Sequence, residues 1–113
     1  MKLIFLLLPI LYTNVLVKSF EHNQHLKIVT EGSYEIIKTK GTRIIVESYY
    51  QNNAPAKLQE YITTRYSIQG IVTDSLTTIN ILKPERKLIV NKHVINEDIN
   101  SKIYVPEDIH IIN

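Results

Sequence analysis

The chain has 113 residues, no cysteine and a formal net charge of +2. This length suits one domain with a modest core, and the lack of cysteine excludes a disulfide framework. Lys2 and Lys18 account for the whole charge excess, so residues 20–113 hold eleven basic and eleven acidic side chains. A neutral domain lacks the basic face of a nucleic-acid-binding protein, so no nucleic-acid partner is expected.

The N-terminus begins with a single lysine followed by a short apolar run, which is the layout of a secretory signal peptide. Val17 and Ser19 are small enough to precede a cleavage site. The sequence therefore predicts that residues 1–19 are a signal peptide and that residues 20–113 form a single β-rich domain. We expect a secreted protein, or one of the periplasm and cell envelope.

An uncleaved membrane anchor is the alternative for this segment. The apolar run is about fifteen residues long, shorter than the roughly 20 that a helix needs to cross a membrane. Pro9 and Asn14 interrupt it. No stable membrane span is expected after cleavage.

Isoleucine, valine and threonine are abundant beyond the leader, whereas alanine occurs there only at Ala54 and Ala56. β-Branched side chains favour strands over helices. The predicted fold is mainly β (α+β), with antiparallel hairpins and a meander of about seven short strands and one short helix. Strand patterns cover residues 26–30, 33–39, 42–49, 66–72, 76–82, 87–90, 99–105 and 109–112.

The first three of these strands are separated by a repeated tetrapeptide, Thr-x-Gly-Ser/Thr, at residues 30–33 and 39–42. Glycine supplies the positive φ of a tight hairpin turn, so both repeats predict two-residue hairpins and a three-stranded meander. The period of two places one set of apolar side chains on a common face. The set is Leu26, Ile28, Tyr34, Ile36, Ile44 and Val46.

A short helix of about ten residues is predicted after this meander. Asn53 is a candidate N-cap, and Pro55 is tolerated in a first helical turn. Leu58, Ile62 and two tyrosines follow at helical spacing. We expect Tyr61 and Tyr66 to anchor the helix on the sheet.

The order of short segments after residue 26 resembles small secreted proteins of bacterial envelopes, of the auto-transporter adhesin head type. The closest similarity lies in Ile103–Ile109, which resembles a strand-turn-strand unit of that family. The resemblance implies stacked β-hairpins, a role in binding or adhesion, and no catalytic residues. With only three glycines, the chain corresponds to one terminal module of such an array at most. The segments are TKGTRIIVES, YSIQGIV, TTINILK, KLIVN and SKIYVPEDIHI.

His22 and His25 have a spacing that could serve a metal ion, because imidazole binds zinc, copper and nickel. They lie in a polar stretch just after the expected cleavage site, where chain ends are usually solvated. His93 and His110 are too distant in sequence to complete a site by spacing. No metal or other cofactor is expected.

Catalytic constellations are not evident in the sequence. Asp74-Ser75 lacks the G-x-S-x-G context of a hydrolase nucleophile, and no cysteine is available. The acidic pairs Glu97-Asp98 and Glu107-Asp108 lie where turns are expected. A pocket that joins His93 to a carboxylate would favour an enzyme.

Tyr49 and Tyr50 are the candidate binding residues. Adjacent residues of a strand face opposite sides of the sheet, so one of the two points outward. Tyrosine offers apolar area with a polar tip, which suits contact with a glycan or a peptide. We expect an exposed binding surface here.

The apolar segment Ile109–Asn113 is expected at a sheet edge, where a homo-oligomer can form through strand pairing. Together these features predict an exported, non-enzymatic β-rich module of the cell envelope with a binding, adhesion or structural role. Its partner would be a protein or glycan of the envelope. The alternative is a small periplasmic or secreted enzyme, or an enzyme inhibitor, whose site is not readable from the sequence.

Overall fold

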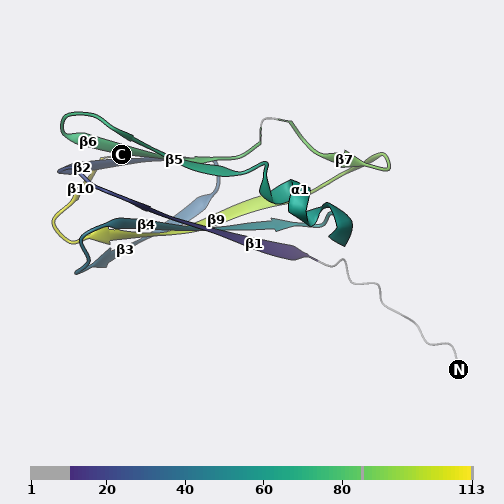
Figure 1. Cartoon of the computed structure of the whole chain (residues 1–113), viewed down its shortest axis with the longest axis horizontal. Helices are drawn as coiled ribbons and strands as arrows, with labels where there is room; N and C mark the ends of the chain where they lie inside the picture. The colour runs from purple at the N-terminus through teal and green to yellow at the C-terminus, as the bar shows by residue number, and fades with distance from the viewer. Residues whose placement is uncertain (1–10, 85, 113) are drawn as a thin grey trace, which may run out of the picture.

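A computed structural model describes residues 11–84 and 86–112 of the chain. Two four-stranded sheets pack face to face, with one short helical segment beside them (Figure 1). Within these residues the mainly β class with one short α-helix is confirmed. Sheet A contains, in spatial order, β1 (Tyr12–Phe20), β4 (Ile44–Asn52), β9 (Glu97–Pro106) and β3 (Ser33–Thr39). Sheet B contains β10 (His110–Ile112), β2 (His25–Thr30), β6 (Leu76–Leu82) and β5 (Ser67–Val72).

The remaining elements are short. A 3₁₀ turn, η1 (Ala56–Leu58), leads into α1 (Gln59–Thr63), and β7 (Ile89–Val90) pairs with β8 (His93–Val94). Within the described residues no helix has the length and apolar character needed to cross a membrane.

Both sheets are mixed, and the predicted meander is wrong. β2 lies in sheet B, where it pairs in parallel with β6 and β10, while β3 lies in sheet A. β3 and β4 share a sheet, but β9 lies between them. The strands were predictable because the period of two fixes which face is buried, whereas it does not fix the neighbouring strand.

The repeated tetrapeptide forms a local turn in both places, without a hairpin. Gly32 N–H donates to Thr30 Oγ1 at 3.2 Å, and Gly41 N–H donates to Thr39 Oγ1 at 3.2 Å. These are side-chain turns, which need no positive φ, and no glycine among the described residues has one. Gly32 serves a close approach, because a Cβ there would collide with the Ile99 carbonyl oxygen.

The core fills the space between the sheets with alternate residues of both. At its centre Ser48 and Ser101, which face each other on β4 and β9, share a buried hydrogen bond of 2.8 Å. A buried hydroxyl pair is tolerated because each partner satisfies the other. The buried apolar strand residues are Leu26, Ile44, Val46, Tyr50, Ile68, Ile79, Ile81, Ile99, Ile103 and Val105.

The helical segment covers the end of the core near β4 and β5. Ile62 is buried, and Tyr66 stacks on Tyr50 with ring centroids 3.9 Å apart. Tyr61 is 53% exposed, so its predicted role as a core anchor is wrong. The helix begins after Leu58, and Asn53 accepts a hydrogen bond from a distant backbone N–H without capping it. The predicted stripe fails because α1 ends before Tyr66, which is buried in the connection to β5.

Residues 12–20 form the edge strand β1, which pairs antiparallel with β4 along its whole length. The predicted leader therefore falls in two parts: residues 1–10 lie outside the described residues, and the rest reaches into sheet A. Cleavage after Ser19 would remove nearly all of β1 and leave β4 as an edge strand. The predicted edge position of the C-terminal strand is confirmed, because β10 is the outermost strand of sheet B.

Candidate binding face

The outer face of sheet A brings together polar residues from three strands. The strand register places Tyr49 between Val15 of β1 and Asn100 of β9. It also places Gln51 beside Asp98. Because side chains alternate along each strand, all of these point away from the core.

A hollow of about 340 Å³ lies on this face. Its lining combines one aromatic ring with hydroxyl, amide, carboxylate and ammonium groups, so that hydrogen-bond donors and acceptors surround a partly apolar surface. Five of its six lining residues belong to β4 and β9, the two central strands of sheet A. The lining residues are Thr13, Tyr49, Gln51, Asp98, Asn100 and Lys102.

Tyr49 is held in place at the rim of this hollow. Its hydroxyl donates to Glu47 Oε2 at 2.7 Å. That hydrogen bond, with burial and the negative charge of Glu47, raises the pKa of the Tyr49 hydroxyl above its ordinary value of 10.0. The hydrogen bond to the Glu47 carboxylate orients the Tyr49 ring at the rim of the hollow.

The other polar groups of the hollow are largely free. Within the described part of the chain, no hydrogen bond or ion pair engages the side chains of Gln51, Asp98 or Lys102. Asn100 accepts one hydrogen bond from Ser33, at 3.3 Å. These groups can exchange bound water for a ligand without breaking contacts that hold the fold together.

A neighbouring hollow of about 320 Å³ extends this surface to the end of sheet A. Asp98 and Asn100 line both hollows, and Glu31, Ser33 and Lys83 continue the polar lining. We call the two adjoining hollows together the sheet A groove.

Tyr50 does not belong to this surface, and its predicted exposure is wrong. Its side chain is 2% exposed and points into the core, where it stacks on Tyr66. Burial raises the pKa of its hydroxyl, which has no hydrogen-bond partner among the described residues. Only Tyr49 of the predicted pair faces outward, as the alternation of strand residues requires.

The sequence reasoning missed Asp98, Asn100 and Lys102. They were assigned to a turn and a strand by local pattern, and no spacing rule links them to Tyr49. A signal was present, however: these three polar residues alternate with Ile99, Ser101 and Ile103, which are buried. Such a polar row on one face of a strand indicates that this face is exposed to solvent.

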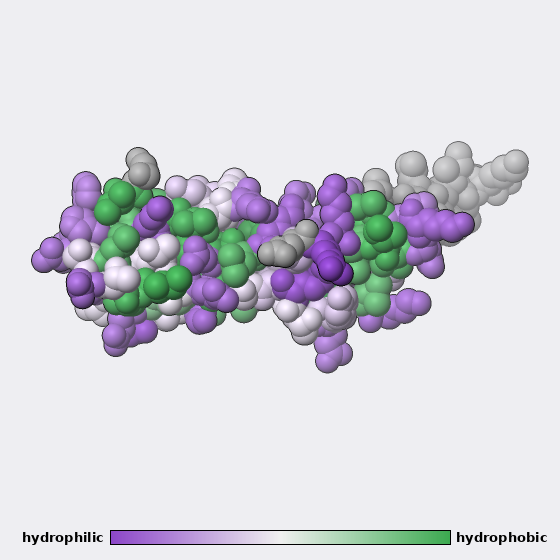
Figure 2. All heavy atoms as spheres, turned by 90° about the horizontal axis from the view of Figure 1, so that it is seen from above, coloured by the Kyte–Doolittle hydropathy of each residue, from purple (hydrophilic) through white to green (hydrophobic). Residues whose placement is uncertain are grey.

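The opposite outer face, on sheet B, is chemically different. Exposed Val29, Ile71, Leu82 and Ile112 are separated there by polar residues such as Lys27. Figure 2, which views the molecule from this side, shows small apolar areas divided by hydrophilic ones.

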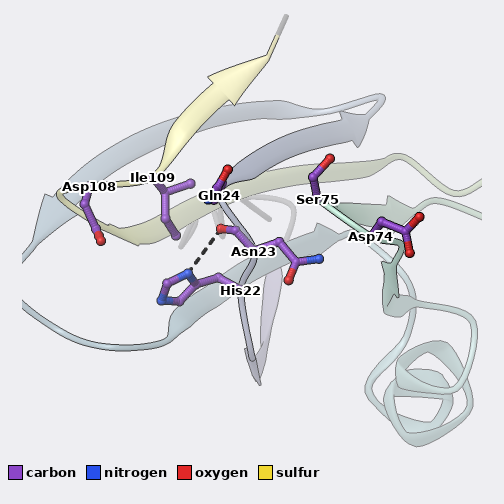
Figure 3. A pocket seen from close by; sticks show the side chains of 7 residues that line it. All are labelled: His22, Asn23, Gln24, Asp74, Ser75, Asp108 and Ile109. Carbon is purple, nitrogen blue, oxygen red and sulfur yellow. Dashed lines mark hydrogen bonds between the residues drawn. The ribbon is translucent and has the colours of Figure 1, made fainter.

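A hollow of about 510 Å³ lies where the loops of both sheets meet (Figure 3). It contains His22, Ser75 and two aspartates, which is the composition of a hydrolase triad. The side chains do not converge: Figure 3 shows His22 and Ser75 pointing apart, and His22 Nδ1 lies 3.2 Å from the Asn23 carbonyl oxygen. A nucleophile needs a base within hydrogen-bond reach, which this arrangement does not supply. The lining residues are His22, Asn23, Gln24, Asp74, Ser75, Asp108 and Ile109.

His110 lies in the predicted C-terminal strand, whereas His25 lies outside the solvated stretch that the sequence predicted for it. His25 begins β2 and contacts His110 of β10 edge-to-face, with ring centroids 5.6 Å apart. It is not part of a solvated tail in this chain. The described residues contain no group of three His, Cys, Asp or Glu side chains arranged to hold a metal ion. Among the residues that the structure describes, no carboxylate lines the hollow beside His93.

The prediction that Glu97 lies in a turn is also wrong, because Glu97 is the first residue of strand β9. Its carboxylate accepts hydrogen bonds from Arg65 at 3.2 Å and from the Tyr66 hydroxyl at 2.7 Å. The Arg65 and Glu97 side chains are 11% and 6% exposed, so this is a nearly buried ion pair. It holds the start of β5 against β9.

Comparison with known proteins finds no matching family, no matching curated protein and no similar solved structure.

Proposed function

We propose that this chain is an exported, non-enzymatic module of the cell envelope that binds a glycan through the sheet A groove. Support for export comes from the leader-like N-terminus, with its single lysine and short apolar run. Support for binding comes from one observation above all. Tyr49 and the free polar groups of Gln51, Asp98 and Lys102 surround a single hollow on a sheet face.

A sugar ring fits this set of groups chemically. Its hydroxyls both donate and accept hydrogen bonds, which matches an accepting carboxylate, a donating ammonium and two amides that do both. Its C–H faces are apolar and pack on aromatic rings, as Tyr49 provides. In the full chain the hollow of about 340 Å³ falls in the range of ordinary small-ligand sites, which begin at roughly 300 Å³. Cleavage after Ser19 would remove Thr13 from its lining and keep the five lining residues of β4 and β9.

The test is binding to a panel of soluble oligosaccharide fragments of envelope polymers, measured by calorimetry. We expect Tyr49→Ala and Asp98→Ala to weaken binding at least tenfold, about 1.4 kcal/mol each. Lys27→Ala, a charge removal on the outer face of sheet B, is the matched control and leaves affinity unchanged.

Two results would contradict the proposal. One is a panel in which no fragment binds while an extended peptide does, which would assign the groove to a protein ligand. The other is equal loss of glycan binding in Lys27→Ala and Tyr49→Ala, which would show that the groove does not determine affinity.

A further inference from the structure

Strand β1 contacts the core side of the domain through every second side chain, and on its outer side Ser19 Oγ accepts a hydrogen bond from Arg43 Nε at 2.6 Å. Asn14, Leu16 and Lys18 point inward, whereas Val15 and Val17 are 54% and 58% exposed. None of the nine side chains of β1 is fully buried. The strand is therefore the peripheral part of sheet A, held by a backbone ladder to β4 and by a few specific side-chain contacts.

Each inward side chain meets its own complement. Asn14 Nδ2 donates to Gln59 Oε1 at 3.2 Å, and Leu16 packs against the core. Lys18 Nζ donates to the Ile68 carbonyl oxygen at 3.0 Å. The rest of the domain therefore offers an amide, an apolar surface and a carbonyl oxygen to three successive inward side chains of β1.

The cation position has a second component in Phe20. Lys18 Nζ lies 5.5 Å from the centroid of the Phe20 ring, within cation–π range. The ring occupies a notch above Gly70, where a Cβ would lie 2.5 Å from Phe20 Cδ1. Cleavage after Ser19 would leave Phe20 as the first residue of the processed chain. The Ile68 carbonyl oxygen and the Phe20 ring, which both contact Lys18 Nζ, would therefore remain.

We infer that the processed chain binds an extended segment of a partner protein in the vacated β1 position. The segment would carry the pattern Asn-x-Leu-x-Lys, with its backbone paired to β4. This inference rests on the proposed export and on removal of residues 1–19. It follows from strand physics, because an edge strand with unpaired N–H and C=O groups accepts another strand, and pockets for alternate side chains give specificity.

The β4 edge is a better acceptor than the C-terminal edge that the sequence suggested. β4 offers a ladder along its nine residues, whereas β10 has three.

The experiment uses the full chain with a protease recognition sequence inserted between Ser19 and Phe20, cut only after folding. The probe is a synthetic peptide of residues 11–19 that carries Val17→Cys. Val17 faces Glu47 in the β1–β4 register, so the probe is offered to the Glu47→Cys variant of the chain. The chain has no native cysteine, so a disulfide reports this register alone.

In buffer that contains glutathione disulfide as the oxidant, we expect the probe to replace the cut strand and form the disulfide with the Glu47→Cys variant. A probe with Val15→Cys should react instead with Tyr49→Cys, its register partner. As competitors, unlabelled peptides with Lys18→Glu or Leu16→Ala should be at least tenfold weaker than the unmodified peptide. The outward-facing variant Val15→Thr is the matched control and should compete as well as the unmodified peptide.

The inference is overturned by any of three results. In the first, the cut chain loses strand β1 and unfolds. In the second, the probe never replaces the cut strand below the melting temperature of the chain. In the third, all competitor peptides bind equally well, which means that the β4 edge does not recognise side chains. Export is read separately, from the intact mass of protein recovered from the exporting cell. If the recovered protein has the mass of the full chain while the probe still replaces the cut strand, the proposed removal of residues 1–19 is rejected. The ability of the β4 edge to bind a strand is not.

Discussion

Lys18 Nζ donates a hydrogen bond to the Ile68 carbonyl oxygen at 3.0 Å, across the open side between strands β1 and β5. On the opposite side Lys38 of β3 does the same to Ile109, just before β10. Each edge strand of sheet A thus sends one inward lysine to a carbonyl at the edge of sheet B. The lysines thus close the two lateral sides of the sandwich by hydrogen bonds that cross from one side to the other.

The lysine contact at β3 is expected to stabilise the domain measurably. Lys38→Met removes the donor and leaves the Ile109 carbonyl without this partner, which should lower the free energy of unfolding by about 1–2 kcal/mol. Urea denaturation followed by circular dichroism measures the change. The matched control Lys102→Met removes an exposed lysine on the outer face, and should stay within about 0.5 kcal/mol of the unmodified chain. Equal losses in both variants would contradict the closing role of Lys38.

The buried cluster around Tyr66 predicts a loss of stability in alkaline solution. Burial, and then the hydrogen bond to Glu97, raise the pKa of the Tyr66 hydroxyl well above its ordinary value of 10.0. The unfolded chain therefore loses this proton first as the pH rises. The stabilisation is present in full below pH 10, and it is lost progressively as the pH rises above 10.

Thermal melts between pH 8 and pH 11.5 test this dependence. Tyr66→Phe should flatten the decline above pH 10, at the cost of about 1 kcal/mol at neutral pH from the lost hydrogen bond. Tyr34→Phe, which alters an exposed tyrosine, should decline like the unmodified chain. A Tyr66→Phe variant that still declines with the unmodified slope would show that another group controls the alkaline transition.

The strand content was predictable from the sequence, whereas the strand neighbours were not. The alternation in residues 33–39 and 76–82 matches β3 and β6 to the residue, because burial of one face imposes a period of two. The pairing partners of β3 and β2 come from distant parts of the chain, and no local pattern encodes a parallel neighbour. The two Thr-x-Gly segments were wrongly predicted to be hairpins, because glycine is common both in hairpin turns and where another backbone approaches closely.

The candidate site was predictable only in part, for a related reason. Alternation requires one of Tyr49 and Tyr50 to point outward, and the period that places Ile44 and Val46 on the core face also places Tyr50 there. In the fold, Tyr50 stacks on Tyr66. Asp98 and Lys102 join the groove through the β4–β9 register, which is a tertiary feature. The local sequence therefore indicated that an exposed tyrosine surface exists, whereas the pairing of β4 with β9 determines which other residues line the sheet A groove.

Processing of the leader is expected to change the exposed edge of sheet A. If residues 1–19 are removed on export, the intact mass of the recovered protein should correspond to a chain that begins at Phe20. Hydrogen exchange should then be fast at those β4 amides that pair with β1 in the full chain. Recovery of the full-length chain, with the β4 amides protected, would show that β1 is a permanent part of the domain.

The contact between Gly70 and Phe20 gives a prediction whose sign depends on the background. Alanine normally stabilises a strand relative to glycine by roughly 0.5–1 kcal/mol, because it loses less backbone entropy on folding. In the intact chain Gly70→Ala should instead destabilise the fold by about 1–3 kcal/mol, since the added Cβ would lie 2.5 Å from Phe20 Cδ1. In a Phe20→Ala background the obstruction is gone, and the same substitution should be neutral or stabilising. A double-mutant cycle by urea denaturation measures this coupling, and a Gly70→Ala effect that is the same in both backgrounds would mean that the ring does not occupy the notch.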